Sequence, residues 1–543
     1  MSDSRFVANP VDLDMSRSVF DRSSQHKTSF DSAKLVPIYL DEVLPGDTFT
    51  LDTAVVLRMG TPIAPVMDNA YLDIFYFFVP NRIVWDHWEQ FCGANDTTFW
   101  TQSVEYTIPI CNDSASRSID DLGVYFGLNT AVASCDFCIS ELPFRGYFKI
   151  WNDWFRDENT QAPYLFTIGD ASNAGLMNSA LQKVNKLHDY FTSCLPAPQK
   201  GASVSLPLGT EASVKTKSSD VMTPAAGQVL DDIRFGVDPS LEANTYGVYL
   251  GTDFGHVGQL IHSSNLEAPS TDHLGSPINL IADLSTATAA TINQLRLAFQ
   301  VQKLLERDAR GGTRYVEMLK AHFGVTSPDA RLQRSEYLGG KRINVHTQQV
   351  LSTTAPQSET ADATLGTTGA YSLTTDKSSG FTKSFTEHGY IIGVACVRTD
   401  HTYGQGVNRL FTRQHRFDFY YPALANIGEQ PVKTLEIFAM SLTPDDLVFG
   451  YQEAWAEYRF KPSIVSSSMN PSETGSLDYW TYADVFSAAP VLNDTFMYET
   501  PSNIARTLAA GVTTQQFVAD FYFKVKAARP MPVYSVPGLI DHH

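Results

Sequence analysis

The segment Phe521-Tyr-Phe-Lys-Val-Lys526, near the C-terminal end of this 543-residue chain, has the most regular pattern in the sequence. Its odd positions carry Phe, Phe and Val, and its even positions carry Tyr, Lys and Lys. Successive side chains of a β-strand point to opposite faces, so this alternation puts the apolar side chains on one face. The segment is therefore predicted to be a half-buried strand of a β-rich fold.

Five other segments are rich in aromatic and β-branched residues, are bounded by Gly, Pro or Asn, and are also predicted to be strands. They are Leu35 to Leu40, Tyr71 to Val79, Gly389 to Val397, Arg416 to Tyr421 and Leu435 to Met440. Strands of a compact meander follow one another at intervals of about 8 to 12 residues. These segments lie tens of residues apart, which predicts long insertions running out from one β-scaffold.

Helical periodicity and capping signals predict four helices in the gaps between these strands. Their expected ranges are Asn81 to Gly93, Pro143 to Arg156, Thr291 to Arg310 and Thr313 to Phe323. The last two would be separated by a Gly-Gly break. Two stretches rich in small polar residues, 211–290 and 352–380, are predicted to be surface insertions.

The composition favours an assembly and argues against a protein whose whole surface binds nucleic acid. Charged residues make up only 18% of the chain, and the formal net charge is −19. A lightly charged surface on so long a chain suggests burial against partners, although a large β-rich monomer could have the same composition. Because nucleic-acid binding depends on neutralising phosphates, any contact with a genome must be local.

The sequence offers little support for a catalytic, cofactor or metal site. No HExxH, GxSxG or GxGxxG motif occurs. Cys135 and Cys138 have half of a zinc-ribbon spacing but no second pair at a usable distance, and the six cysteines are expected to be reduced. The neighbours Glu387 and His388 lack a nucleophile and are predicted to be structural. No apolar run is long enough for a membrane span, and the N-terminal residues do not have the pattern of a signal peptide.

The basic residues allow two interpretations. Residues 296–342 contain ten Lys or Arg and five Asp or Glu, a net charge of +5. This polarity suits a genome-facing surface, but the alternating signs suit salt-bridged helix packing equally well. Residues 1–30 are predicted to form a weakly structured, interior-facing N-terminal arm. Its candidate DNA contacts are Arg5, Arg17, Arg22 and Lys27, the alternative being a solvated tail.

The C-terminal residues 529–543 are predicted to be an extended arm between subunits. Pro530, Pro532 and Pro537 remove backbone donors and keep the chain extended. The apolar residues between them exceed what a free tail tolerates, and the alternative is packing on its own subunit. The candidate contact residues are Met531, Val533, Tyr534 and Val536.

Long, specific strings of residues lie in order over nearly the whole chain. In the first half they are Phe20-Asp-Arg-Ser23, His26-Lys-Thr-Ser-Phe-Asp31, Leu35-Val-Pro-Ile-Tyr39, Asp41-Glu-Val-Leu-Pro-Gly-Asp-Thr-Phe49, Phe77-Phe-Val-Pro-Asn-Arg82, Trp154-Phe-Arg-Asp-Glu-Asn159 and Cys194-Leu-Pro-Ala-Pro-Gln-Lys-Gly201. In the second half they are Lys303-Leu-Leu-Glu-Arg-Asp-Ala-Arg-Gly-Gly-Thr-Arg-Tyr315, Gly380-Phe-Thr-Lys-Ser-Phe-Thr-Glu-His-Gly-Tyr390, Ile427-Gly-Glu-Gln430 and the segment from Ala528 to Asp541. Together these strings resemble the major capsid protein of the gokushoviruses, a group of the Microviridae.

This resemblance implies a mainly β chain with one eight-stranded antiparallel jelly roll and long loop insertions that contain several helices. It implies a virion protein of a bacteriophage, assembled in the host cytoplasm as sixty copies in a T=1 icosahedral shell around circular single-stranded DNA. The insertion 211–290 would be a protrusion at the threefold axes that contacts a host receptor. A small basic internal protein is a candidate partner in DNA packaging. The alternative from another class is a β-rich carbohydrate-binding or carbohydrate-active protein, because jelly rolls host both functions.

Overall fold

The computed structural model describes residues 17–94, 104–111, 118–129, 139–202, 204, 213–216, 246–247, 261–262, 280–283, 292–353, 365–439, 447–509 and 515–534. The chain divides into two compact units. The first unit comprises Met1–Gly201 with Leu305–His543, and the second comprises Ala202–Leu304. The first unit contains two large antiparallel sheets.

The predicted C-terminal strand is confirmed and lies inside the first sheet. This sheet consists of β1 (Ser18–Asp21), β2 (Ser24–Phe30), β4 (Thr48–Met59), β15 (Thr374–Ser384) and β19 (Phe517–Arg529). β19 pairs with β4 on one side and with both β2 and β1 on the other, and β15 pairs with the far side of β4. Along β19, buried and exposed side chains alternate as the sequence predicts.

The second sheet has the strand order β12–β5–β16–β3. Its strands are β3 (Val36–Val43), β5 (Ala70–Pro80), β12 (Glu336–Asn344) and β16 (Gly389–Thr399). The strands predicted at residues 35–40, 71–79 and 389–397 are confirmed as β3, β5 and β16. The two central strands, β5 and β16, are buried along nearly their whole length, which is typical of strands covered on both faces.

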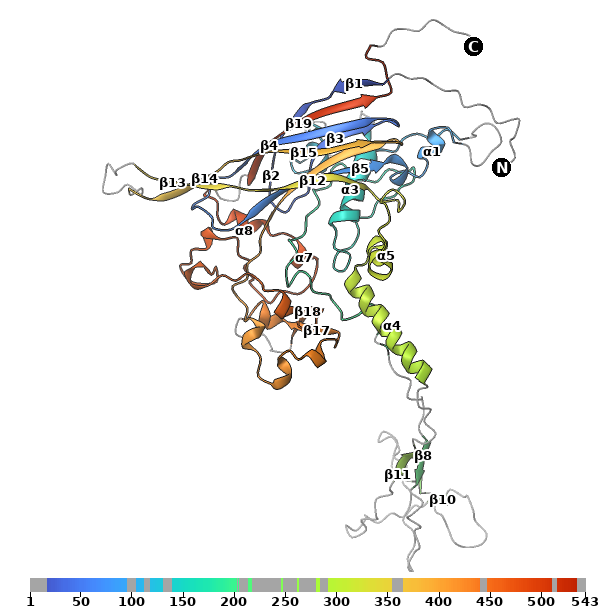
Figure 1. Cartoon of the computed structure of the whole chain (residues 1–543), viewed down its shortest axis with the longest axis vertical. Coiled ribbons are helices and arrows are strands. Elements are labelled where there is room, and N and C mark those ends of the chain that lie inside the picture. The colour runs from blue at the N-terminus through green and yellow to red at the C-terminus, as the bar shows by residue number, and fades with distance from the viewer. Residues whose placement is uncertain are drawn as a thin grey trace, which may run out of the picture. The chain divides into compact units, whose positions relative to one another are not determined.

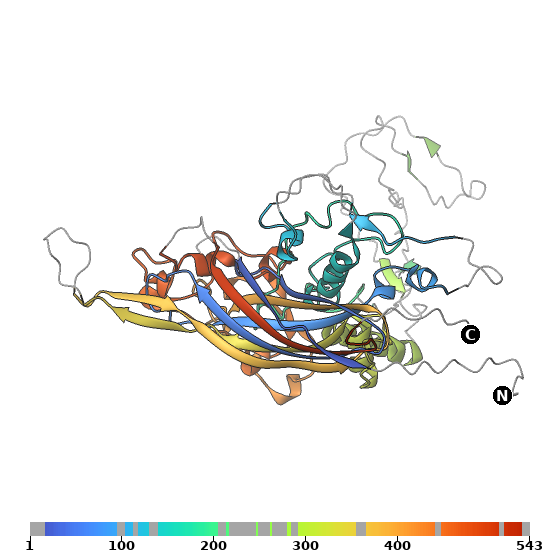
Figure 2. The same ribbon diagram turned by 90° about the horizontal axis from the view of Figure 1, so that it is seen from above.

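The two sheets lie face to face (Figures 1 and 2). Aromatic side chains from both sheets pack together between them. The ring of Tyr39 on β3 lies 5.0 Å from that of Phe523 on β19. The hydroxyl groups of Tyr76 on β5 and Thr53 on β4 are 2.5 Å apart, which satisfies both polar groups within the core. The core therefore lies between the sheets and joins the two ends of the chain.

A helix covers the outer face of the second sheet. α3 (Leu142–Ile150) continues into a π-helical turn at Trp151–Phe155, which confirms the helix predicted at residues 143–156. The helix lies very close to the sheet at Gly146, where an added Cβ would be 2.9 Å from the Cδ1 of Ile392. The next two predicted helices are also confirmed, as α4 (Ile292–Gly311) and α5 (Tyr315–Phe323).

Three predictions of local structure are wrong. The helix expected from Asn81 to Gly93 is broken into a 3-10 turn, η1 (Asn81–Ile83), and α1 (Trp88–Phe91), and Trp85 between them is fully buried. The strands expected at 416–421 and 435–440 are 3-10 turns, η5 (Arg416–Asp418) and η7 (Thr434–Glu436). In the first of these, the carboxylate of Asp418 accepts bonds from the backbone N–H groups of Gln414 and His415, which closes a turn in place of a strand ladder.

The expected insertion at 352–380 is also wrong in its second half. There β14 (Thr368–Ser372) pairs with β13 (Thr347–Leu351), and β15 starts two residues later. The Ser and Thr content suggested a loop, but Thr is a good strand former and half of these side chains face solvent. Residues 354–364 lie outside the described part of the chain.

The remaining elements are short. They are α2 (Leu122–Tyr125), α6 (Ala456–Arg459), α7 (Asp494–Met497), α8 (Pro501–Ala505), β6 (Ile110–Cys111), β7 (Ile139–Ser140), β17 (Glu429–Lys433), β18 (Val448–Glu453), η4 (Arg409–Phe411), η6 (Pro422–Leu424), η8 (Ser467–Met469) and η9 (Asp478–Trp480). β17 and β18 pair over a second, smaller apolar cluster that includes Phe191, Phe449 and Phe496. In the second unit, β8 (Ser213–Thr216) pairs with β11 (Leu280–Asp283), and β9 (Tyr246–Gly247) pairs with β10 (Ile261–His262). Within the described residues, no helix combines the length and apolar character needed to cross a membrane.

Candidate genome and subunit interfaces

An open cavity of about 750 Å³ lies where the π-helical turn after α3 meets the break between α4 and α5. Basic side chains outnumber acidic ones in its wall. The basic residues are Arg156, Lys186, Arg310, Arg314, Lys320 and Arg398, and the acidic ones are Asp157, Glu158 and Glu317. Such a wall is a candidate phosphate contact, provided that its cations are free to bind a ligand.

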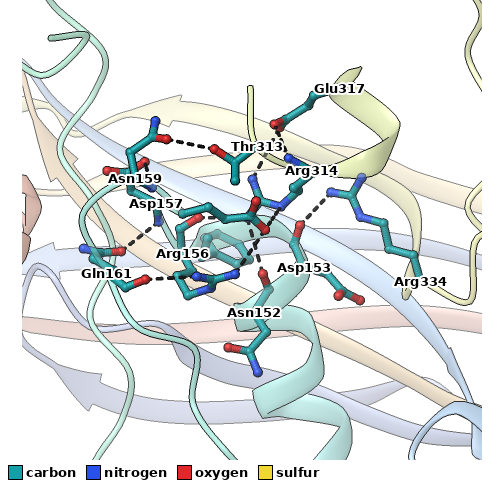
Figure 3. Close-up of polar contacts among 12 residues, drawn as sticks. Asn152, Asp153, Arg156, Asp157, Asn159, Gln161, Thr313, Arg314, Glu317 and Arg334 are labelled. Carbon is teal, nitrogen blue, oxygen red and sulfur yellow. Dashed lines mark hydrogen bonds and ion pairs between the residues drawn. The ribbon is translucent and has the colours of Figure 1, made fainter. Parts of the chain in front are cut away.

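Arg314 is the central residue of this wall, and its guanidinium is already occupied (Figure 3). Its Nη2 donates to the backbone carbonyl oxygens of Asn152, at 3.3 Å, and Arg156, at 2.8 Å. Its Nε lies 3.2 Å from Glu158, and its Nη1 lies 3.4 Å from Glu317. Arg314 therefore ties α5 to the end of α3 and has little capacity left for a phosphate.

The Gly-Gly break places Arg314 in this position. Gly312 has a φ of +98°, which favours glycine, and an added Cβ there would lie 2.8 Å from the Cβ of Glu317. Thr313 then donates from Oγ1 to the Oδ1 of Asn159 at 2.8 Å (Figure 3). The break is a tight connection between two helices, as the sequence predicts, and its glycines serve packing.

Other basic residues of the 296–342 segment are also held within the first unit. The Arg334 guanidinium stacks 3.7 Å from the centre of the Trp154 ring and donates to the Asp153 carbonyl oxygen at 2.7 Å (Figure 3). Arg342 makes two bonds to the buried Asp73, at 2.7 and 3.0 Å. Of the two interpretations, salt-bridged packing accounts for these residues. Lys320, in the cavity wall, makes no ion pair within the described part of the chain, so the cavity keeps some free positive charge. Arg331, which lies outside the wall, is likewise unpaired among the described residues.

The four candidate DNA contacts of the N-terminal segment have different surroundings in the structure. Arg5 lies outside the described residues, and Arg17 is exposed. Arg22 is paired with Asp41 at 2.6 Å, and Lys27 is exposed on β2 with Asp520 at 3.6 Å. The expectation of a weakly structured arm over residues 1–30 is wrong for residues 18–30. These residues form β1 and β2, because their backbone groups pair with those of β19.

The C-terminal contact residues begin where the first sheet ends. Arg529, the last residue of β19, is anchored by its ion pair with Asp47 at 3.3 Å. Beyond it, Val533 is 59% exposed and Tyr534 is 82% exposed, whereas Met531 is partly buried. Val536 lies outside the described residues. The described part of the arm thus presents apolar side chains to solvent. Its packing on a second copy stays a prediction.

A buried charge cluster was not found from the sequence. His401 lies between two carboxylates, with Nδ1 2.9 Å from Asp484 and Nε2 3.0 Å from Glu499. Lys186 donates to the same Asp484 at 3.0 Å, and all four side chains are almost completely buried. Burial alone would lower the pKa of His401, but the two carboxylates outweigh it and raise the pKa to about 10. His401 is 83 positions from Asp484 and 98 from Glu499, and Lys186 is 298 positions from Asp484, so no local sequence signal could have revealed the cluster.

The pair Glu387 and His388 has the structural role that the sequence predicts. Glu387 accepts from Arg82 at 2.6 Å, and the His388 ring packs edge-on against Trp88 with 5.5 Å between ring centres. Cys135 and Cys138 lie outside the described residues. Asp86, His87 and Asp170 could together reach a cation, but Asp170 already accepts bonds from Trp85 and His87.

Comparisons with known proteins give one consistent result. A family model described as "Capsid protein (F protein)" matches residues 11–539. The chain is 41% identical to the capsid protein VP1 of Bdellovibrio phage phiMH2K, over 96% of this chain and 95% of that protein. It is 40% identical to the capsid protein VP1 of Spiroplasma virus 4, over 95% and 94% of the two chains. It is 37% identical to the capsid protein VP1 of Chlamydia phage 1, over 96% of each chain.

Proposed function

Because this chain belongs to the capsid protein (F protein) family of the microviruses, we propose that sixty copies of it form a T=1 icosahedral shell around circular single-stranded DNA. The predicted resemblance to gokushovirus major capsid proteins is confirmed by the relatives. A structural role in the virion follows from the family, and assembly in the host cytoplasm is part of the proposal. The observation that carries the finer proposal is the strand order of the two sheets.

This strand order supports an eight-stranded jelly roll. If β1 and β2 count as one interrupted edge strand, each sheet has four positions, in the orders β2–β19–β4–β15 and β12–β5–β16–β3. Strands that follow one another along the chain, such as β3, β4 and β5, then alternate between the sheets. This is the connectivity of a jelly roll, in which two Greek keys wrap around one core.

The proposed genome contact is local. The exposed Arg17 and Lys27 lie close to β1 and β2, and Arg5 precedes them in the chain. With a net charge of −19, the chain would hold DNA through such groups, and a small basic internal protein would supply further positive charge. Arg22 remains a candidate only if its pairing with Asp41 still leaves donors for a phosphate.

The proposed host contact is the insertion 211–290. It lies within the second unit, Ala202–Leu304, which forms its own cluster of contacts. The sequence of a separate unit can change without disturbing the core of the first unit, which suits a surface that must match a bacterial receptor. We propose that this unit forms the protrusion at each threefold axis.

The alternative of a carbohydrate-active protein has little support in the cavity beside Arg314. A glycosidase needs two carboxyl groups about 5 to 10 Å apart that are free to act on the sugar. Glu158 and Glu317 in the cavity wall are both bound to Arg314, and Glu158 is also bound to Arg156. These acids therefore serve as partners of arginines.

Imaging of purified particles tests the proposal. Expression of the full chain should give closed shells of sixty subunits by electron microscopy, with single-stranded DNA inside particles recovered from an infected host. A monodisperse monomer near 60 kDa at all concentrations would contradict the capsid assembly.

A further inference from the structure

The first unit carries an aromatic groove that nothing in the described structure covers. It has a volume of about 290 Å³ and is lined by Tyr420, Trp455 and Tyr458 together with Ala425, Ala454 and Arg459. The ring of Tyr420 lies 5.7 Å from that of Trp455 and 6.2 Å from that of Tyr458. Tyr420 and Tyr458 are 45% and 52% exposed, whereas Trp455 forms the floor at 8%.

The groove is rigidly built. Trp455 has a φ of +68°, in the left-handed region, and its Nε1 donates to the carbonyl oxygen of Leu424 at 2.9 Å. The guanidinium of Arg413 lies 4.3 Å from the centre of the Tyr458 ring and supports it from the side. The Tyr458 hydroxyl accepts from the backbone N–H of Tyr420 at 3.4 Å, so its own proton is free to be donated. The surface is therefore preformed, with an unused donor at its rim.

The C-terminal arm has the sequence that such a groove recognises. A polyproline helix has three residues per turn, so residues three apart share a face. With that period, Met531, Tyr534, Pro537 and Ile540 share one face, and Pro530, Val533, Val536 and Leu539 share the next. The third face carries only Pro532, Ser535, Gly538 and Asp541. The arm thus has two adjacent apolar faces and one small or polar face.

We propose that the C-terminal arm of one copy, residues 530–541, binds as a polyproline helix in the Tyr420–Trp455–Tyr458 groove of a neighbouring copy. The inference rests on the proposed capsid function. Aromatic-lined grooves bind polyproline segments because the ligand is already extended and loses little entropy on binding. A polyproline helix has no internal hydrogen bonds, so its carbonyl groups can accept the free Tyr458 proton.

Two observations favour a second copy as the source of the arm. β19 ends beside β1 at the top of Figure 1, whereas β18, which leads into Trp455, and its partner β17 lie towards the bottom on the other side of the sheets. In addition, each copy has one arm and one groove, so exchange between neighbours occupies every groove when a symmetric shell closes.

A disulfide trap in assembled shells tests the inference. The variant Tyr458→Cys with Tyr534→Cys should form covalent dimers and longer chains after mild oxidation, in at least about tenfold excess over either single variant. The matched control is Tyr371→Cys with Tyr534→Cys, because Tyr371 is 45% exposed, close to the 52% of Tyr458, but lies on the β14 hairpin. The single variants also measure the background from the native exposed Cys92.

A second pair and an assembly measurement complete the test. If Tyr458→Cys does not fold, Tyr420→Cys with Val533→Cys serves the same purpose. Tyr458→Ala should lower the yield of shells as strongly as removal of the arm, and the combined variant should be no worse than either change alone. Intact shells without a cross-link, or a cross-link within one chain, would overturn the inference while the capsid function stands. Failure of the unmodified chain to form shells would overturn both.

Discussion

Arg22, in the turn between β1 and β2, donates to both oxygens of Asp41, with Nε 2.9 Å from Oδ2 and Nη2 2.6 Å from Oδ1. Asp41 is buried, whereas the Arg22 side chain is 43% exposed. A carboxylate removed from water depends on such a partner. The candidate DNA contacts in the N-terminal segment therefore do not share one role, since Arg22 is also part of the fold.

This pairing gives a prediction that separates stability from DNA binding. Arg22→Gln should lower the free energy of unfolding by about 1 to 3 kcal/mol, because it leaves the buried Asp41 carboxylate with only the more distant Arg529, at 3.8 Å, as a charged partner. Arg17→Gln with Lys27→Gln should leave unfolding within about 0.5 kcal/mol but lower the packaged DNA or its salt resistance. Chemical denaturation and measurement of nucleic acid per particle check the two effects. Unchanged DNA content in the second variant would move the genome contact to Lys320 and Arg331.

The His401 cluster predicts how stability depends on pH. The pKa of His401 is about 10 in the folded chain and about 6.5 when exposed, so the folded state holds the proton more tightly. Its contribution is complete below about pH 6.5, declines above it and is lost as the pH passes about 10. Burial would raise the pKa of Asp484, but His401 and Lys186 hold it below its ordinary value, so that contribution is lost as the pH falls below about 3.8.

His401→Gln should therefore lower the free energy of unfolding by about 3 to 5 kcal/mol at pH 6, since it leaves two buried carboxylates with one cation. It should also flatten the decline in stability between pH 6.5 and 10. The exposed His188 provides the matched control, and His188→Gln should change neither quantity. An unaltered pH profile in the His401 variant would show that another group titrates.

Arg314→Lys tests whether Arg314 stabilises the fold by tying α5 to the end of α3. A lysine has one charged nitrogen and cannot reach two carbonyl oxygens and two carboxylates in different directions. We expect a loss of about 1 to 3 kcal/mol in unfolding free energy, against less than about 0.5 kcal/mol for the exposed Arg331→Lys. Equal stability of both variants, measured by thermal unfolding, would contradict this stabilising role of Arg314.

Replacement of residues 216–288 by a short Gly/Ser linker should leave a soluble, β-rich protein. The segment lies within the second unit, and loop length adds closure entropy only slowly. Circular dichroism and sedimentation measure the result. Shells without infectivity would support a role in host contact, and loss of all soluble product would place the segment in the core.

Truncation after Arg529 should leave a folded subunit that does not assemble. The change keeps β19 and the ion pair of Arg529 with Asp47, so thermal unfolding should be nearly normal. Sedimentation should show monomers or small oligomers, because the apolar arm can no longer bind a neighbour. An unfolded product would mean that the arm packs on its own subunit, and intact shells would contradict the intersubunit role.

The period of a strand is local, and the sequence therefore predicted β3, β5, β16 and β19 correctly. It also predicted α3, α4 and α5, because the helical period, Pro143 at the start of α3 and the Gly-Gly pair at the end of α4 are local signals. β4 was missed although Phe49, Leu51, Thr53, Val55 and Leu57 alternate strictly, so a search for alternation alone would have found it. The strand wrongly predicted at 435–440 had apolar composition without sustained alternation. The one wrongly predicted at 416–421 does alternate over Arg416-Phe-Asp-Phe419, but there the Asp418 carboxylate closes a turn.

By itself, the sequence determined the family, the β-rich class and the helices around the Gly-Gly break. Long specific strings and short-range periodicity can be recognised without knowing any tertiary contact. The tertiary structure decided which charges are free. Arg314 and Arg22 resemble Lys320 and Arg17 in the sequence, yet the first two are bound to carboxylates that the fold brings to them. Whether a cation contacts a genome or braces the fold depends on partners far away in the chain, and only folding brings such partners together.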